Sequence, residues 1–270
     1  MPGVNGICNT IMSHFGADFE LFLRHGAASR NFRNFAQKVV GIAHHWQVRA
    51  GAFGDKTRPD GRDDPAGWEI EMKLYYSPGA CSLASHITLN EAGVPYTAEK
   101  VDLRAKRTES GADFAAINPR GAVPALELDD GEVLTEGVAI MQHVMDSAAP
   151  GALPAPGTLA RARLSEALNY VSTEVHKTYS PLFRGLEGDA KANQLALLDA
   201  RLQVVEDRLA KNDWLAGDGY SPADAYFFTV TNWSKGMGHD LSKFPRVTAL
   251  RAKVAARPAV QKAMQAEGLI

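Results

Sequence analysis

The pattern of secondary-structure signals changes at a connector rich in proline and glycine, residues 149–157 (APGALPAPG). Before the connector, across residues 72–150, short strand and helix signals alternate in the order βαβαββα. After it, across residues 158–270, the signals are helical, and the clearest is a 3-4-3-4 spacing of apolar residues at Leu195, Leu198, Leu202, Val205 and Leu209. Because such connectors are typical of domain boundaries, the sequence predicts an α/β domain followed by an all-α domain.

Turn and cap residues separate the predicted elements. The elements before the connector are strands at Lys73–Tyr76, Tyr96–Val101, Ala125–Leu128 and Glu132–Leu134, and helices at Cys81–Ala92, at Asp113–Ile117 and through Val138 and Met145. The Pro78-Gly79 turn closes the first strand, Gly93 ends the first helix, and Asp129-Asp130-Gly131 predicts a hairpin turn. In the second domain, Ser221-Pro222-Ala223-Asp224 predicts a capped helix start.

The first 71 residues differ from the rest of the chain. Residues 1–54 have weak periodicity and no acidic residue between Leu21 and Gly54, which faintly resembles an organelle transit segment. Residues 55–67 (DKTRPDGRDDPAG) are charged and almost free of apolar side chains, so we predict a disordered linker. Two interpretations follow. Residues 1–71 are an added, disordered extension, or the start is assigned too far upstream and Met72 is the initiator.

Composition argues against several classes of protein. The chain carries 29 Lys and Arg against 31 Asp and Glu, a formal charge of −2 that argues against nucleic-acid binding. No run approaches the roughly 18 apolar residues of a membrane span. Two cysteines, Cys8 and Cys81, are too few for a disulfide-stapled secreted scaffold. No zinc-ligand spacing, dinucleotide fingerprint or phosphate loop occurs. We therefore expect a cytoplasmic protein without a metal site or a nucleic-acid or membrane partner.

Cys81 is the residue that most suggests chemistry. It follows a strand and a Pro-Gly turn, so it is expected at a helix N-terminus, where amide groups and the helix dipole favour the nucleophilic thiolate. The alternative is a small buried hydrophobe, a common role of unpaired cysteine. Because Ala84 stands three positions later, an intramolecular dithiol pair is excluded, and the thiol needs an external thiol partner.

Two further segments have a possible binding role. Pro124 stands at the start of a strand, where a cis bond would turn the backbone of Val123 toward an extended peptide ligand. An ordinary trans turn proline is the alternative. At Leu134–Gly137 a strand passes directly into a helix, whose first amides attract a carboxylate, while Glu136 could pair with an ammonium group. Glu136 is equally explained as a favourable acid in a first helical turn.

Asn169 and His176 are seven residues apart and are expected on one helix face. A neutral histidine could donate or accept a hydrogen bond near a thiolate, and the asparagine could bind a ligand amide or carboxylate. Plain packing at a domain interface is the alternative for both residues.

From Met72 to Ile270 the chain resembles the bacterial beta-class glutathione S-transferases, whereas residues 1–71 do not. The resemblance rests on MKLYYSPGACSLASHITLNEAG at 72–93, INPRGAVPALELDDG at 117–131, LTEGVAIMQ at 134–142, LNYVSTEVHKTYSPLF at 168–183 and YSPADAY at 220–226. It implies a thioredoxin-like N-terminal domain followed by an all-helical domain, assembled as a homodimer.

The resemblance also implies roles for single residues. The catalytic residues would be Cys81, which lies against the glutathione sulfur and can form a mixed disulfide with it, Ser82 beside it, and His176 close to the sulfur. The glutathione-binding residues would be Val123 and the cis Pro124 at the cysteinyl unit, Glu136 and Gly137 at the γ-glutamyl end, Lys106 near the glycyl carboxylate, and Asn169 from the helical domain. Glutathione would be the co-substrate, with no metal.

These implications predict a detoxifying glutathione transferase that conjugates the glutathione thiolate to hydrophobic electrophiles. The second substrate would lie between the domains, against Tyr179, Phe183 and Trp233. The alternatives are glutaredoxin-like thiol–disulfide exchange or glutathione peroxidase as the main activity, or a non-catalytic binding protein of the same fold. Tyr76 is a rival thiolate partner if Cys81 is mainly redox-active.

Overall fold

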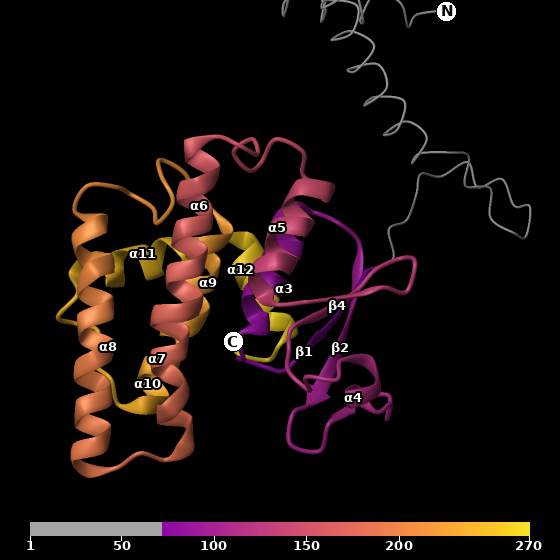
Figure 1. The fold of residues 1–270 in the computed structure, drawn as a ribbon, viewed down its shortest axis with the longest axis horizontal. Helices are drawn as coiled ribbons and strands as arrows, with labels where there is room; N and C mark the ends of the chain where they lie inside the picture. The colour runs from indigo at the N-terminus through magenta and orange to yellow at the C-terminus, as the bar shows by residue number, and fades with distance from the viewer. Residues whose placement is uncertain (1–71) are drawn as a thin grey trace, which may run out of the picture. The chain divides into compact units, whose positions relative to one another are not determined.

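The computed structural model describes residues 72–270, so the predictions for residues 1–71, including Cys8, lie outside the described residues. The first domain contains a five-stranded sheet in the order β3-β2-β1-β4-β5 (Figure 1). Its strands are β1 (Met72–Tyr76), β2 (Tyr96–Asp102), β3 (Arg107–Thr108), β4 (Ala125–Glu127) and β5 (Val133–Thr135). Strands β1 and β2 are parallel, with Leu74 opposite Ala98, and the other neighbouring strands are antiparallel.

Three helices complete the first domain: α3 (Ser82–Ala92), α4 (Phe114–Ile117) and α5 (Gly137–Ala148). Strand residues alternate between two faces of the sheet, so each face has its own apolar cluster. Leu74 and Leu126 pack with Ile140 of α5 on one face, whereas Tyr75 packs with Phe114 of α4 on the other. This mixed sheet with its helices is a thioredoxin-like domain.

The second domain is helical. Its segments are α6 (Leu159–Tyr170), the π-helical segment η1 (Val171–His176), α7 (Lys177–Tyr179), the 3-10 segment η2 (Ser180–Arg184), α8 (Gly188–Leu209), α9 (Pro222–Thr231), α10 (Trp233–Met237), α11 (Pro245–Ala255) and α12 (Pro258–Ala266). Helices α9 and α12 both pack against α3 of the first domain, so α3 lies at the junction of the two domains (Figure 1).

Most predicted elements are confirmed, with small shifts at their ends. Leu198, Leu202 and Val205 form the buried face of α8, as their spacing predicts. Two features were not predicted. Strand β3 has only two residues, too few to show an alternating pattern, and the π-helical turn of η1 has no signal in the apolar spacing.

Candidate active site

Cys81 and Val123 come together in the structure. Cys81 precedes α3, and its thiol donates a hydrogen bond to the Val123 carbonyl, with 3.2 Å between Sγ and O. The Val123–Pro124 peptide bond is cis, in agreement with the resemblance. Cys81 and Val123, 42 positions apart in the sequence, are therefore in direct contact, and the thiol faces the backbone just before strand β4.

The electrostatics of Cys81 differ from the expectation. Burial raises the pKa of the Cys81 thiol to about 11, although the backbone amides of Cys81 and Ser82 and the nearby Lys177 act to lower it. Glu136 acts in the same direction as burial. The amide groups therefore favour the thiolate as expected, but in the ligand-free protein the loss of solvation outweighs them, as in the alternative of a small buried side chain.

The turn before Cys81 is held from both domains. The Ser82 side chain is fully buried, and its hydroxyl accepts from the Ser77 amide (3.1 Å) and lies 3.3 Å from the Ser77 carbonyl. From the second domain, the Glu267 carboxylate accepts from the Gly79 amide (2.9 Å), and the Trp233 indole donates to the Gly79 carbonyl (2.8 Å). Ser82 therefore follows Cys81 as the first residue of α3, and its hydroxyl is engaged by the turn.

Asn118 organises the loop that leads to Val123. Its side chain donates to the Ala122 carbonyl (2.7 Å) and accepts from the Arg120 amide (3.1 Å), and it is almost completely buried. The Lys106 ammonium donates to the Gly121 carbonyl of the same loop at 2.6 Å. Lys106 is thus anchored along this loop, and its side chain is exposed.

Glu136 precedes α5, with Gly137 as the first helical residue. Glu136 has a positive φ of 67°, a conformation that non-glycine residues seldom adopt and that clusters at functional sites. Its carboxylate pairs with the Arg120 guanidinium at 2.5 Å, and both side chains are more than half exposed. A Cβ on Gly137 would lie 3.5 Å from the Pro124 ring, so Gly137 lies directly beside the Val123–Pro124 segment.

His176 is the last residue of η1 and is half-buried. Its Nδ1 atom lies 2.7 Å from the Tyr226 hydroxyl, and its ring packs edge-on against Trp233 with 5.1 Å between centroids. Burial and, next, the Lys177 charge lower the pKa of His176 to about 4. The imidazole is therefore neutral at neutral pH.

Asn169 lies in α6 with an exposed side chain, and no hydrogen bond or ion pair joins it to His176 or Cys81 among the interactions of residues 72–270. The expectation of one shared helix face assumed an uninterrupted α-helix. Because η1 has the wider π-helical turn between the two residues, a spacing of seven no longer corresponds to two turns.

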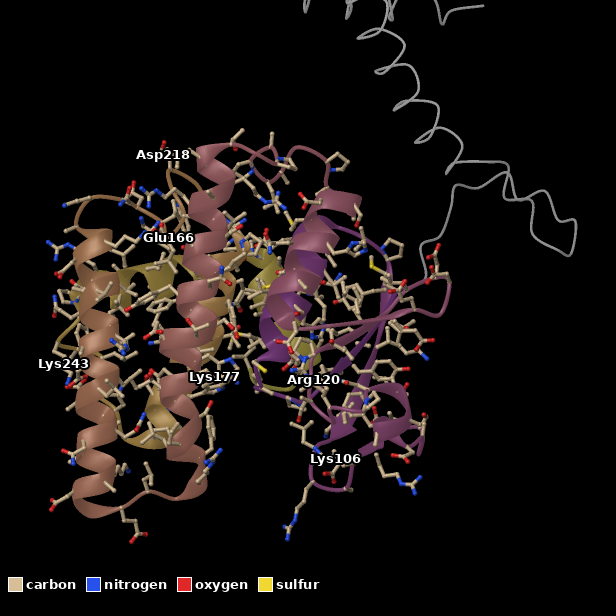
Figure 2. The ribbon with its side chains drawn as sticks, in the orientation of Figure 1. Lys106, Arg120, Glu166, Lys177, Asp218 and Lys243 are labelled. Atoms are coloured by element: carbon tan, nitrogen blue, oxygen red, sulfur yellow. The ribbon has the colours of Figure 1, made fainter. Side chains whose placement is uncertain are left out.

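Besides Asn118 and Glu267, described above, sequence reasoning missed three residues around the site. Tyr226 contacts His176, Lys177 acts on Cys81, and Arg120 pairs with Glu136. Lys177 directly follows His176 and Arg120 precedes Val123 by three positions, so sequence proximity was the available signal for both. Tyr226 had no such signal, because it lies 50 positions from His176. Figure 2 shows Arg120 and Lys106 on the first domain and Lys177 on the second.

The residues expected to contact a second substrate have different environments. Phe183 is 55% exposed and packs edge-on against Trp233, with 5.1 Å between centroids. Tyr179 is fully buried, and its hydroxyl lies 2.5 Å from the Ser234 hydroxyl. Tyr179 is therefore a core residue, and the expectation that it contacts substrate is wrong. Tyr76 packs against His86 (5.4 Å between centroids), and no hydrogen bond joins it to Cys81 within residues 72–270.

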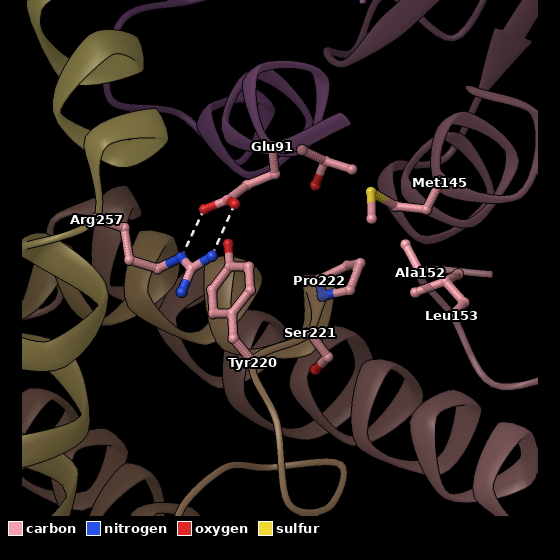
Figure 3. A pocket seen from close by; sticks show the side chains of 9 residues that line it. Glu91, Met145, Ala152, Leu153, Tyr220, Ser221, Pro222 and Arg257 are labelled. Carbon is pink, nitrogen blue, oxygen red and sulfur yellow. Dashed lines mark hydrogen bonds and ion pairs between the residues drawn. The ribbon is translucent and has the colours of Figure 1, made fainter. Parts of the chain in front are cut away.

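A cavity of about 230 Å³ lies elsewhere at the domain junction, and none of the predicted site residues lines it (Figure 3). One wall is apolar and includes Met145 and Leu153. The other is formed by the two-bonded ion pair of Arg257 with Glu91, at 2.6 and 2.8 Å, and by the Tyr220 ring 3.7 Å from the guanidinium. These groups join α12 to α3, so we assign this wall a structural role.

The described part of the chain contains no helix long and apolar enough to cross a membrane. Within residues 72–270, no group of three or more His, Cys, Asp or Glu side chains is arranged to hold a metal ion.

Two family models match the chain. The model of the glutathione S-transferase N-terminal domain matches residues 79–147, and that of the glutathione S-transferase C-terminal domain matches residues 170–258. The first 71 residues lie outside both matches.

Individual relatives agree with this assignment. The chain is 48% identical over 200 residues to glutathione S-transferase GstA of Escherichia coli O157:H7, covering 73% of this chain and all of that protein. A sphingomonad glutathione S-transferase solved with glutathione is 44% identical, with a TM-score of 0.70. The bacterial beta-class glutathione S-transferase of Sphingomonas chungbukensis is 41% identical, also with a TM-score of 0.70. Both structures cover 73% of this chain and are themselves matched over their full length.

Proposed function

The chain belongs to the glutathione S-transferase family and, over residues 72–270, resembles its bacterial beta class, and from this premise we propose that it conjugates glutathione to hydrophobic electrophiles. The observation that carries the proposal is the 3.2 Å contact between the Cys81 thiol and the Val123 carbonyl. That carbonyl is the group expected to pair with the cysteinyl unit of glutathione, so the Cys81 contact marks where the glutathione sulfur would lie.

Glutathione carries two carboxylates and one ammonium, and the charges around Cys81 suit this pattern. Glu136 would bind the γ-glutamyl ammonium, with the first amides of α5 at Gly137 receiving its carboxylate. The Lys106 ammonium is hydrogen-bonded to the Gly121 carbonyl, in the loop before Val123, and would pair with the glycyl carboxylate. Asn169 would contact the ligand from the helical domain. The extended tripeptide would pair with Val123 by a short strand addition.

The chemistry in this proposal is nucleophilic substitution. The glutathione thiol loses its proton to solvent, and the thiolate then forms a carbon–sulfur bond with the electrophilic carbon of an aryl halide while the carbon–halogen bond breaks and halide leaves. Neutral His176 would stabilise the thiolate by a hydrogen bond, and Lys177 adds positive charge on the same side. Phe183 and Trp233 provide apolar surface for the electrophile.

Thiol–disulfide exchange is the second candidate, favoured by the position of Cys81 against Val123. In this reaction the Cys81 thiolate attacks glutathione disulfide, forms a bond to one glutathione sulfur and expels the other glutathione as thiolate. Because burial raises the pKa of Cys81 to about 11, the ligand-free enzyme has little thiolate for this step at neutral pH. We therefore place conjugation first.

Turnover of an activated aryl chloride by Cys81→Ala and His176→Ala variants separates the two activities. If conjugation is the main reaction, Cys81→Ala retains most of the turnover and His176→Ala loses about tenfold or more. If exchange dominates, mass spectrometry finds a glutathione adduct on the wild-type protein, and Cys81→Ser abolishes both the adduct and disulfide reduction. Absence of both activities in a folded protein that retains glutathione would indicate a non-catalytic binding protein and would contradict our proposal.

The cellular role that we propose rests on the proposed conjugation chemistry. We propose a detoxifying role in the cytoplasm, where glutathione is kept reduced. We also propose that the protein works as a homodimer, which size-exclusion chromatography with light scattering would test. A monomer with full turnover would contradict the second proposal.

A further inference from the structure

Tyr226 is a buried polar residue that the proposed chemistry leaves unused. It lies in the second turn of α9, is 6% exposed, and its hydroxyl lies 2.7 Å from His176 Nδ1. Helix α9 also packs against α3, which begins directly after Cys81. Tyr226 is thus positioned to connect the helical domain with the thiol site.

We propose that Tyr226 is a positioning residue that holds His176 in the tautomer with its hydrogen on Nε2, so that the neutral imidazole donates a hydrogen bond to the glutathione sulfur. This inference deepens the proposed function and rests on it for the identity of the sulfur ligand. It assigns His176 the role of a hydrogen-bond donor and not that of a general base.

The tautomer follows from hydrogen-bond accounting. A buried phenol must place its hydrogen on an acceptor, and His176 Nδ1 lies 2.7 Å from the Tyr226 oxygen. The Ser172 hydroxyl also hydrogen-bonds Tyr226 and acts to lower its pKa, which is the effect of a donor to the phenol oxygen and not of an acceptor. If Tyr226 donates to Nδ1, that nitrogen carries no hydrogen, and Nε2 of the neutral ring must carry it. The opposite arrangement, with Nδ1 donating, would require the Ser172 hydroxyl to accept from the phenol, against its pKa-lowering effect on Tyr226.

The surroundings support the same protonation states. Burial and, next, the ionised form of Cys81 raise the pKa of Tyr226, whereas Ser172 acts to lower it, so the phenol stays protonated at neutral pH. The pKa of His176 is lowered to about 4, so the ring stays neutral. Trp233 packs edge-on against the imidazole and restricts its rotation. Because Cys81 affects the pKa of Tyr226, the Tyr226 and His176 side chains lie close to the Cys81 thiol.

The tautomer itself can be measured in the full-length protein without any substrate. Long-range proton–nitrogen correlation spectra of the nitrogen-15-labelled chain report which ring nitrogen carries hydrogen, and His176→Gln identifies the signal of His176 among the eight histidines. We expect hydrogen on Nε2 from pH 6 to pH 8. Hydrogen on Nδ1 would overturn the inference, and this result does not depend on whether the proposed conjugation is correct.

Tyr226→Phe removes the hydroxyl and keeps the ring. We expect the pKa of the bound glutathione thiol, followed by thiolate absorbance, to rise. We also expect kcat with an activated aryl chloride to fall about fivefold near neutral pH, as for one lost hydrogen bond. The KM for glutathione should stay within about twofold, and the lost turnover should return at high pH, where the thiol ionises unaided. A uniform loss at all pH values would indicate a merely structural role and would overturn the inference.

Tyr220→Phe is the matched control. The Tyr220 hydroxyl is also buried in the helical domain, but it lies beside the Glu91–Arg257 pair, lines the separate cavity and has no hydrogen bond to His176 or Cys81 within residues 72–270. We expect wild-type kcat and an unchanged thiol pKa for this variant. A double variant, His176→Ala with Tyr226→Phe, should lose no more than His176→Ala alone, since Tyr226 acts through His176; additive losses would contradict the inference.

Discussion

At the scale of single residues, the balance between burial and nearby charge decides the state of each reactive group. Two backbone amides and the Lys177 charge favour the Cys81 thiolate, but burial has the larger effect and raises the pKa of Cys81 to about 11. The His176 imidazole shows the same effect in the opposite direction, since burial keeps the base neutral. Solvation is therefore the largest influence on both side chains.

The pKa of Cys81 predicts slow alkylation of the ligand-free enzyme at neutral pH. Because the thiolate is the reacting form, the rate with iodoacetamide should rise about tenfold per pH unit and level off only near pH 11. Mass spectrometry of the Cys81 peptide measures this rate. A plateau below about pH 8.5 would show that the amide groups and the dipole outweigh burial after all.

Lys177→Met tests the contribution of the neighbouring charge. Lys177 acts to lower the pKa of Cys81, so its removal should raise that pKa further and slow alkylation at pH 9 by roughly two- to fivefold. Lys177→Arg retains the charge and should react at the wild-type rate. Equal alkylation rates for Lys177→Met and the wild-type protein would show that Lys177 does not affect the pKa of Cys81.

At the scale of elements, the start of α9 is the clearest case of a sequence signal with a structural cause. The Asp224 carboxylate accepts from the Ser221 amide (2.9 Å), the Ser221 hydroxyl (2.8 Å) and the Leu215 amide (2.9 Å). Despite these bonds, burial raises the pKa of Asp224 to about 6. This cap fixes the start of the helix that carries Tyr226, the residue in contact with His176.

Asp224→Ala should lower the free energy of unfolding by about 2 kcal/mol, since it leaves the buried Ser221 and Leu215 amides without an acceptor. Urea denaturation at pH 7 measures the loss. Asp240→Ala is the control: Asp240 also caps a neighbouring serine, Ser242, but it is exposed, so the change should stay within about 0.5 kcal/mol. Equal effects for the two variants would contradict the importance of burial at the α9 cap.

At the scale of the whole molecule, the Glu267 carboxylate supports the turn that precedes Cys81. Glu267, just after α12, accepts from the Gly79 amide and lies 2.9 Å from His86 Nδ1, and the Glu267 and His86 side chains are both almost completely buried. Residues separated by 188 positions are thus joined directly at the turn that precedes Cys81.

Glu267→Ala should cost about 2 to 4 kcal/mol of unfolding free energy, because it leaves His86 and the Gly79 amide buried without a partner. It should also reduce the affinity for glutathione, since the turn beside Cys81 loses one support. Asp213→Ala breaks the exposed pair with Lys253 and should change stability by less than about 1 kcal/mol. Denaturation curves and retention on immobilised glutathione measure both effects; a stable variant with wild-type affinity would contradict this account.

Much of the fold could be predicted because its signals are local. The Pro/Gly connector, the αL glycine Gly93 after α3 and the Asp129–Gly131 turn each act within a few residues. Strand β3 and η1 could not be predicted, since a two-residue edge strand and a π-helical turn depend on tertiary contacts. In the site, the positions of Cys81 and the cis Pro124 agree with the resemblance. Tyr179, expected to contact the second substrate, is instead buried in the core, because core and pocket residues have the same apolar pattern in the sequence.

The sequence by itself determined the two-domain organisation, the helix faces and caps, and which residues are chemically competent, because these depend on periodicity and on short-range hydrogen bonds. Tertiary structure alone decided that burial raises the pKa of Cys81, that a π-helical segment separates Asn169 from His176, and that Tyr226 contacts His176 while Glu267 contacts the turn before Cys81. The physical reason is that solvation and long-range hydrogen bonding depend on which atoms surround a group. Those atoms come from segments as far as 188 positions away.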